Sequence, residues 1–132
     1  MEFHVKTIGI ILVILALIHV AFPSYFGWKT ELKSLSLINR EMMYAHTFFL
    51  AFVLLLMGIL CIFESQAIVN TSLGKTISLG FGIFWLARLL TQFFGYSSKL
   101  WIGKRFETVI HILFSFLWTY YVIIFSWVYL NR

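Results

Sequence analysis

The sequence predicts an all-α membrane protein in which four transmembrane helices form one antiparallel bundle. Three observations predict this fold class. Of the 132 residues, 61% are hydrophobic and 11% are charged, whereas a soluble domain has about 25% charged residues. Four apolar stretches each approach the ~20 residues that a helix needs to cross the hydrocarbon core of a bilayer. The connections between the later stretches are short, so consecutive helices should be antiparallel neighbours.

The four predicted spans cover approximately residues 7–26, 42–63, 76–96 and 106–129. Each is continuously apolar and lacks the alternation of a transmembrane β-strand. Lipid offers the backbone no hydrogen-bond partners, so helices are the expected spanning structure. The first stretch is not followed by a small-residue cleavage site, and we expect it to be retained as a span. We expect residues 1–132 to form a single transmembrane domain.

The longest connection, residues 27–41, has an amphipathic pattern. Its apolar side chains and the first of the next span recur at spacings of three and four residues: Trp28, Leu32, Leu35, Ile38 and Met42. Basic residues lie between them. This pattern predicts a short helix that lies in the membrane interface between spans one and two. The alternative is that the stretch extends span two.

The distribution of lysine and arginine predicts the orientation. Residues 27–41 and 97–105 would face one side and contain Lys29, Lys33, Arg40, Lys99, Lys104 and Arg105. The other side contains Lys6, Lys75 and Arg132. The positive-inside rule then places both termini outside, with a bacterial inner membrane as the expected location; termini inside is the alternative. This arrangement accounts for the basic residues without a nucleic-acid partner, and no basic stripe or recognition motif is present.

Aromatic residues agree with the predicted boundaries. Amphipathic rings prefer the membrane–water interface, and a set of them lies near the span edges: Trp28, Tyr44, Tyr96, Trp101, Trp127 and Tyr129. Trp85 and Trp118 are deeper in their spans. We predict that these two face partner helices.

Polar side chains inside the spans are the candidate functional residues, because an ionisable group at the bilayer centre costs about 2.5–3.5 kcal/mol on insertion scales. Span one contains His19, span two His46, span three Arg88 and Gln92, and span four His111. At 1.5 Å per residue, all five lie roughly 6–12 Å from the predicted cytoplasmic ends. They therefore share one leaflet, and we predict a polar site in the cytoplasmic half of the bundle.

Helical spacing links these side chains in pairs. Arg88 and Gln92 are four residues apart and share a face, and so do Glu107 and His111. Glu107 is therefore a candidate to orient the imidazole or to pair with Arg88. The full set of predicted cofactor-binding residues is His19, His46, Arg88, Gln92, Glu107 and His111.

Three ligand chemistries fit this set. The three histidines His19, His46 and His111 could bind a transition metal. Two of them could ligate a b-type haem, with Arg88 on a propionate. Histidine and arginine could instead donate to the oxygens of a quinone or a lipid headgroup. The sequence contains no H-E-x-x-H, H-x-x-x-H or C-x-x-C motif, and a lone membrane histidine also serves as a hydrogen bond between helices.

The predicted function is thus that of a small inner-membrane protein with a redox role, binding haem, a metal or a quinone. No catalytic triad or phosphate-binding glycine loop is recognisable, and catalytic residues are not assigned. One alternative is a non-catalytic accessory or assembly subunit of a larger membrane complex. Another is a transporter or channel, for which four short helices would need to form a homo-oligomer.

Overall fold

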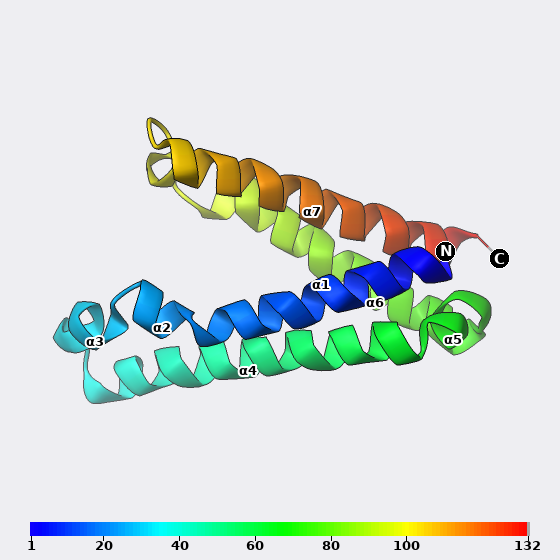
Figure 1. Ribbon diagram of the computed structural model, residues 1–132, viewed down its shortest axis with the longest axis horizontal. Helices are drawn as coiled ribbons and strands as arrows, with labels where there is room; N and C mark the ends of the chain where they lie inside the picture. The colour runs from blue at the N-terminus through cyan, green and yellow to red at the C-terminus, as the bar shows by residue number, and fades with distance from the viewer. Residues whose placement is uncertain (132) are drawn as a thin grey trace. The chain divides into compact units, whose positions relative to one another are not determined.

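Helices form every regular element of residues 1–131, the part of the chain that the computed structural model describes (Figure 1). Four helical segments are long and apolar enough to cross a membrane: α1 (Glu2–Val20), α4 (Leu37–Phe63), α6 with its continuation (Ser72–Gly95), and α7 (Arg105–Leu130). The all-α class and the number of candidate spans are therefore confirmed. The chain divides into two compact units. One is Phe3–Ser65, and the other joins Met1–Glu2 to the chain from Gln66 onward.

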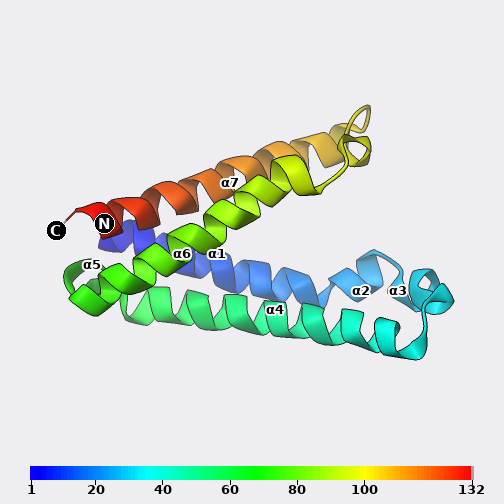
Figure 2. The same ribbon diagram turned by 180° about the vertical axis from the view of Figure 1, so that it is seen from behind.

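In the first unit, α1 and α4 lie side by side and run antiparallel (Figures 1 and 2). The two backbones meet at a pair of glycines. A Cβ atom on Gly9 would lie 2.8 Å from the carbonyl oxygen of Gly58, and a Cβ on Gly58 would lie 2.8 Å from that of Gly9. Buried Cys61 lies at the same contact. Small residues at this position allow the two backbones to touch, as is common between membrane helices.

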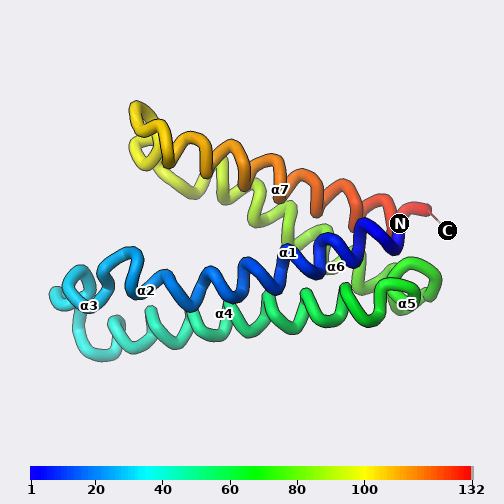
Figure 3. The backbone as a smooth tube through the Cα atoms, in the orientation of Figure 1, coloured from blue at the N-terminus to red at the C-terminus, as the bar shows by residue number. Residues whose placement is uncertain are grey.

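The first candidate span ends at Val20, not at residue 26 as predicted, and it begins at Glu2. Pro23 lies in the next short helix, α2 (Phe22–Tyr25). Proline has no N–H to offer the carbonyl of His19, and in an uninterrupted helix its ring would clash with that carbonyl. The chain makes a tight turn instead, in which Ala21 N donates to Ile18 O at 3.0 Å. The break is visible in the backbone trace (Figure 3).

The predicted single helix over residues 27–41 is wrong in its second half. The structure has α3 (Trp28–Glu31) and the 3-10 turn η1 (Leu32–Ser34), followed by extended backbone with ψ near 150° at Leu35 and Ser36. Residues from Leu37 onward belong to α4, so the alternative of an extended span two is correct there. Trp28 is 8% exposed and packs edge-on against Tyr44, with 5.4 Å between ring centroids. This contact holds the short helix against α4.

The second unit is a hairpin of α6 and α7, which pack against each other along their length. After α5 (Ser65–Asn70), Thr71 caps α6 (Ser72–Leu90) by accepting a hydrogen bond from Gly74 N at 2.9 Å. The π-helical turn η2 (Thr91–Gly95) continues α6. A connection with the 3-10 turn η3 (Ser98–Leu100) leads to α7, whose bounds lie within one residue of the prediction.

Aromatic side chains hold the α6–α7 hairpin together. Trp85 on α6 stacks on Trp118 on α7 with a centroid separation of 4.8 Å and an interplanar angle of 15°. Tyr121 meets Trp85 edge-on at 4.9 Å, and Phe81 meets Phe125 in the same way at 5.2 Å. The prediction that Trp85 and Trp118 face a partner helix is confirmed.

Candidate functional site

Three of the predicted site residues form one hydrogen-bonded chain across the α6–α7 hairpin. Arg88 Nη1 donates to Gln92 Oε1 at 3.2 Å, and Gln92 Nε2 lies 2.7 Å from His111 Nδ1. We call Arg88, Gln92 and His111 the polar chain. The prediction that Arg88 and Gln92 share a face is confirmed by their direct bond, and His111 reaches them from α7.

The polar chain determines which imidazole nitrogen carries the proton. A guanidinium group only donates, so the Gln92 atom that faces Arg88 must be the carbonyl oxygen. The amide nitrogen of Gln92 then faces His111 as a donor, and Nδ1 of His111 must accept. The remaining ring nitrogen, Nε2, therefore carries the N–H. Both ends of the polar chain, the guanidinium and the imidazole Nε2, are hydrogen-bond donors.

The π-helical turn η2 places Gln92 in this chain. Gln92 is 6% exposed, and its amide is the link between the two helices. The turn is compact because Gly95 has no side chain: a Cβ there would lie 2.8 Å from Thr91 Cγ2. π-helical turns are uncommon and often lie at functional sites.

Aromatic rings surround both ends of the polar chain. The Arg88 Cζ atom lies 5.3 Å from the ring centroid of Trp118 and 5.5 Å from that of Tyr96, which is cation–π distance. Trp101 stacks on His111 at 3.9 Å with an interplanar angle of 12°. Thr108 Oγ1 donates to the Trp101 carbonyl at 2.6 Å and so ties this tryptophan's segment to α7.

Three aromatic residues at the site were not predicted to belong to it. From the sequence, Tyr96 and Trp101 were expected to be interface anchors, and Trp118 was expected to pack against a partner helix. A signal was nevertheless present. Trp118 lies seven residues after His111, two helical turns along the same face of one helix. The position of Trp101 depends on the loop that precedes α7 and has no comparable periodic signal.

An open groove of about 380 Å³ begins at His111. It is lined by Phe93, His111, Ile112, Ser115, Phe116 and Thr119. The two hydroxyl groups already donate to backbone carbonyls one turn earlier, Ser115 to His111 O and Thr119 to Ser115 O, each at 2.7 Å. The imidazole is therefore the polar feature of a groove whose other walls are apolar and aromatic.

Two buried donors lie beside the polar chain without an acceptor. The indole Nε1 atoms of Trp85 and Trp118 are buried and have no hydrogen-bond partner in residues 1–131. An indole nitrogen can only donate.

The other two predicted histidines, His19 and His46, are not part of the α6–α7 hairpin. His19 on α1 donates from Nδ1 to Leu15 O at 2.7 Å and packs its ring against Phe22 at 4.5 Å. His46 is exposed on α4. Both belong to the unit of Phe3–Ser65, and His111 belongs to the other unit.

The described residues hold no ready-made metal site and no acid beside Arg88. In residues 1–131 no group of three or more His, Cys, Asp or Glu side chains is arranged to hold a metal ion. Glu107 is exposed in the first turn of α7. Gln92 makes the contact with the imidazole and with Arg88 that the sequence analysis considered for Glu107. The carboxylate instead lies where a helix N-terminus favours negative charge.

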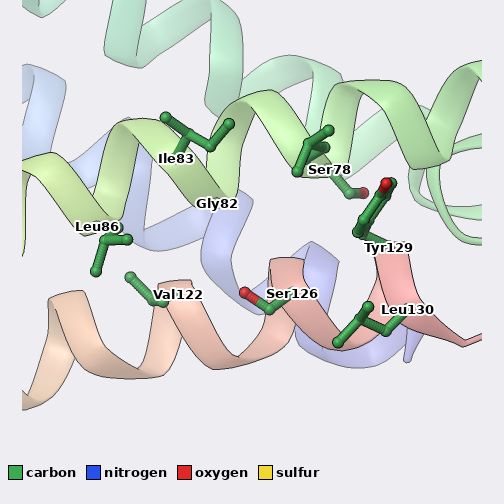
Figure 4. A pocket seen from close by; sticks show the side chains of 9 residues that line it. Ser78, Gly82, Ile83, Leu86, Val122, Ser126, Tyr129 and Leu130 are labelled. Carbon is green, nitrogen blue, oxygen red and sulfur yellow. The ribbon is translucent and has the colours of Figure 1, made fainter.

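A second, smaller cavity of about 170 Å³ lies between α6 and α7, away from the polar chain (Figure 4). Gly82 and the hydroxyls of Ser78 and Ser126 line part of it, and the other walls are mainly apolar. The Ser78 hydroxyl is buried without a partner in residues 1–131. Gly82 leaves room here, because a Cβ on it would meet Phe125 Cβ and Ser126 Oγ at an ordinary 3.7 Å.

The chain matches no family model, no curated protein and no solved structure. Its function is therefore argued from the polar chain and the groove.

Proposed function

We propose that this chain is an integral membrane protein whose α6–α7 hairpin binds a quinone-type ligand from the bilayer. The proposal rests chiefly on one observation: the polar chain ends at His111, whose Nε2–H is a donor inside a candidate span and at the start of an apolar groove. A quinone has the matching chemistry, with carbonyl oxygens that accept hydrogen bonds on an apolar body. A protonated imidazole nitrogen is a suitable donor to such an oxygen.

The geometry suggests how the ligand would be held. A carbonyl oxygen would accept from His111 Nε2, where the groove begins. The ligand ring would rest against Phe93 and Phe116 in the groove, whose volume of about 380 Å³ falls in the usual range for small-molecule sites. The groove is open on one side, so a hydrocarbon tail would extend into the lipid.

A hydrogen-bond donor stabilises negative charge that develops on a carbonyl oxygen, which is the basis for a redox role. Metal and haem binding have less support, because the hairpin of α6 and α7 contains His111 as its one histidine among the described residues. In this proposal the four spans form an antiparallel bundle with both termini outside, and the site lies in the cytoplasmic half.

A fluorescence titration tests the proposal, since Trp101 stacks on His111 and a bound quinone quenches nearby indole emission. The full chain in detergent micelles would be titrated with a benzoquinone that bears one isoprene unit. We expect saturable quenching in the wild type. His111→Phe keeps the aromatic stack but removes the donor, and it should weaken binding about tenfold, equivalent to about 1.4 kcal/mol.

His46→Phe is the matched control, because His46 is exposed on α4 and outside the hairpin. It should bind the quinone as the wild type does. Quenching that never saturates, or an equal loss in the two variants, would overturn the proposal.

A further inference from the structure

The groove that begins at His111 follows one face of α7. His111, Ser115 and Thr119 are spaced four residues apart, so each lies on the same face about 6 Å further along the helix axis. All three side chains line the groove and are partly buried. A ligand that lies along α7 therefore meets their polar atoms in turn.

The first of these polar atoms is a donor. Gln92 donates to Nδ1 of His111 at 2.7 Å, so the imidazole carries its N–H on Nε2, the nitrogen that remains for the groove. The stack on Trp101, with 3.9 Å between ring centroids, holds the imidazole in place. This end of the groove therefore binds an acceptor oxygen, such as a carbonyl or an ether.

The next two polar atoms are acceptors. A carbonyl oxygen only accepts, so the hydroxyls of Ser115 and Thr119 must direct their hydrogens to the carbonyls one turn earlier, each at 2.7 Å. Each hydroxyl oxygen keeps its lone pairs, and within residues 1–131 neither oxygen receives a hydrogen bond. A carbonyl oxygen placed against Ser115 would face these lone pairs, whereas a hydroxyl group would donate to them.

A single six-membered ring spans the distance from the donor to the first acceptor. The rise from His111 to Ser115 is about 6 Å, which is comparable with the separation of two oxygens across a para-substituted ring. Thr119 lies about 12 Å from His111 along the axis, beyond the length of one ring. The rings of Phe93 and Phe116 supply apolar walls. The complementary ligand thus directs an acceptor oxygen toward His111 and a hydroxyl toward Ser115.

We infer that Ser115 makes the groove prefer the reduced form of a quinone, or another ring with a para hydroxyl, over a ring with two acceptor oxygens. This inference rests on the proposed function and names the chemical form of its ligand. A quinol accepts from His111 Nε2 with one oxygen and donates to Ser115 Oγ with the other. A quinone keeps the bond to His111, and its second carbonyl oxygen faces the lone pairs of Ser115.

A matched pair of probes isolates the hydroxyl. One is an alkylated 4-methoxyphenol, and the other is the 4-fluoroanisole with the same ring and tail, in which fluorine replaces the O–H and cannot donate. Calorimetric titration of the full chain in micelles would give the affinity for each. We expect the phenol to bind the wild type about fivefold more tightly, which is the effect of one net hydrogen bond. Equal affinities would overturn this inference and leave the quinone site intact, whereas no binding of either probe would overturn both.

Two substitutions on α7 identify the acceptor. Ser115→Ala removes the hydroxyl oxygen, so the ratio of the two affinities should fall to about one. Thr119→Val is the matched control, because it removes a hydroxyl with the same bond to a backbone carbonyl one turn further along. The ratio should stay at its wild-type value in this variant. A Ser115→Ala variant that keeps the wild-type ratio, or a Thr119→Val variant that loses it, would contradict the inference.

A third substitution tests the orientation of the ring. Both probes present the same ether oxygen to Nε2 of His111, so His111→Phe should weaken the two by the same factor and preserve their ratio. If the hydroxyl lay at His111 instead, this variant would weaken the phenol alone. A ratio that falls to about one in His111→Phe would therefore overturn the assignment of the hydroxyl to Ser115.

Discussion

Replacing Gly58 with alanine should loosen the contact between α1 and α4. The new Cβ would lie 2.8 Å from the carbonyl oxygen of Gly9 and 2.8 Å from Val13 Cγ2. A carbon and a carbonyl oxygen normally approach to about 3.3 Å at closest, so the two backbones must move apart by about half an ångström. Overpacking of this kind costs about 1–3 kcal/mol.

Gly82→Ala is the matched control, because both glycines are buried in helices and both gain about 1 kcal/mol of helix propensity on becoming alanine. At Gly82 the added Cβ meets its neighbours at 3.7 Å and partly fills a cavity. The propensity gain cancels in the comparison, so Gly58→Ala should be about 1–3 kcal/mol less stable than Gly82→Ala.

The assay is the free energy of unfolding in mixed micelles at increasing SDS fraction, followed by far-UV circular dichroism. Gly9→Ala meets the same contact from the other helix and should behave like Gly58→Ala. Equal stabilities of the Gly58→Ala and Gly82→Ala variants, or a less stable Gly82→Ala, would refute the close approach of α1 and α4.

Three further predictions concern the polar chain and the break after α1. Gln92→Leu removes both hydrogen bonds of the polar chain and should lower the free energy of unfolding by about 1–3 kcal/mol in the same SDS assay. An unchanged free energy of unfolding would contradict these two hydrogen bonds. Trp101→Leu removes the ring that stacks on His111, and it should shift the imidazole proton resonances downfield through loss of ring current; unshifted resonances would contradict the stack. Pro23→Ala restores an N–H for the carbonyl of His19 and should slow amide hydrogen exchange over residues 21–25; unchanged exchange would show that proline does not cause the break.

The sequence predicted the number and helical class of the candidate spans well, and it predicted the bounds of α7 within one residue, but it misplaced both ends of α1 and the beginning of α4. Apolar stretches stop at the first charges, such as Lys6 and Arg40, whereas backbone hydrogen bonding continues past them to Glu2 and Leu37. The predicted interfacial helix over residues 27–41 was wrong at Ser36, where the backbone is extended, for a related reason. Side-chain periodicity continues across a short extended segment, because it records spacing along the chain and not backbone conformation.

The polar chain was predicted in part. Spacing of four residues joined Arg88 to Gln92, and depth placed His111 at the same level. The same rule made Glu107 a candidate to orient the imidazole or to pair with Arg88, and in the structure Gln92 makes both contacts. Spacing along one helix links residues of that helix only, so it could not predict the contact between Gln92 on η2 and His111 on α7.

Photoaffinity labelling tests the central claim most directly, that a quinone binds in the groove that begins at His111. The full chain in micelles would be irradiated with an azidoquinone and digested, and the labelled peptides identified by mass spectrometry. We predict labels on Phe93 and on the α7 segment from His111 to Thr119, displaced by excess unlabelled quinone. Labels confined to α1 or α4, or labels that excess quinone does not displace, would contradict the proposed site.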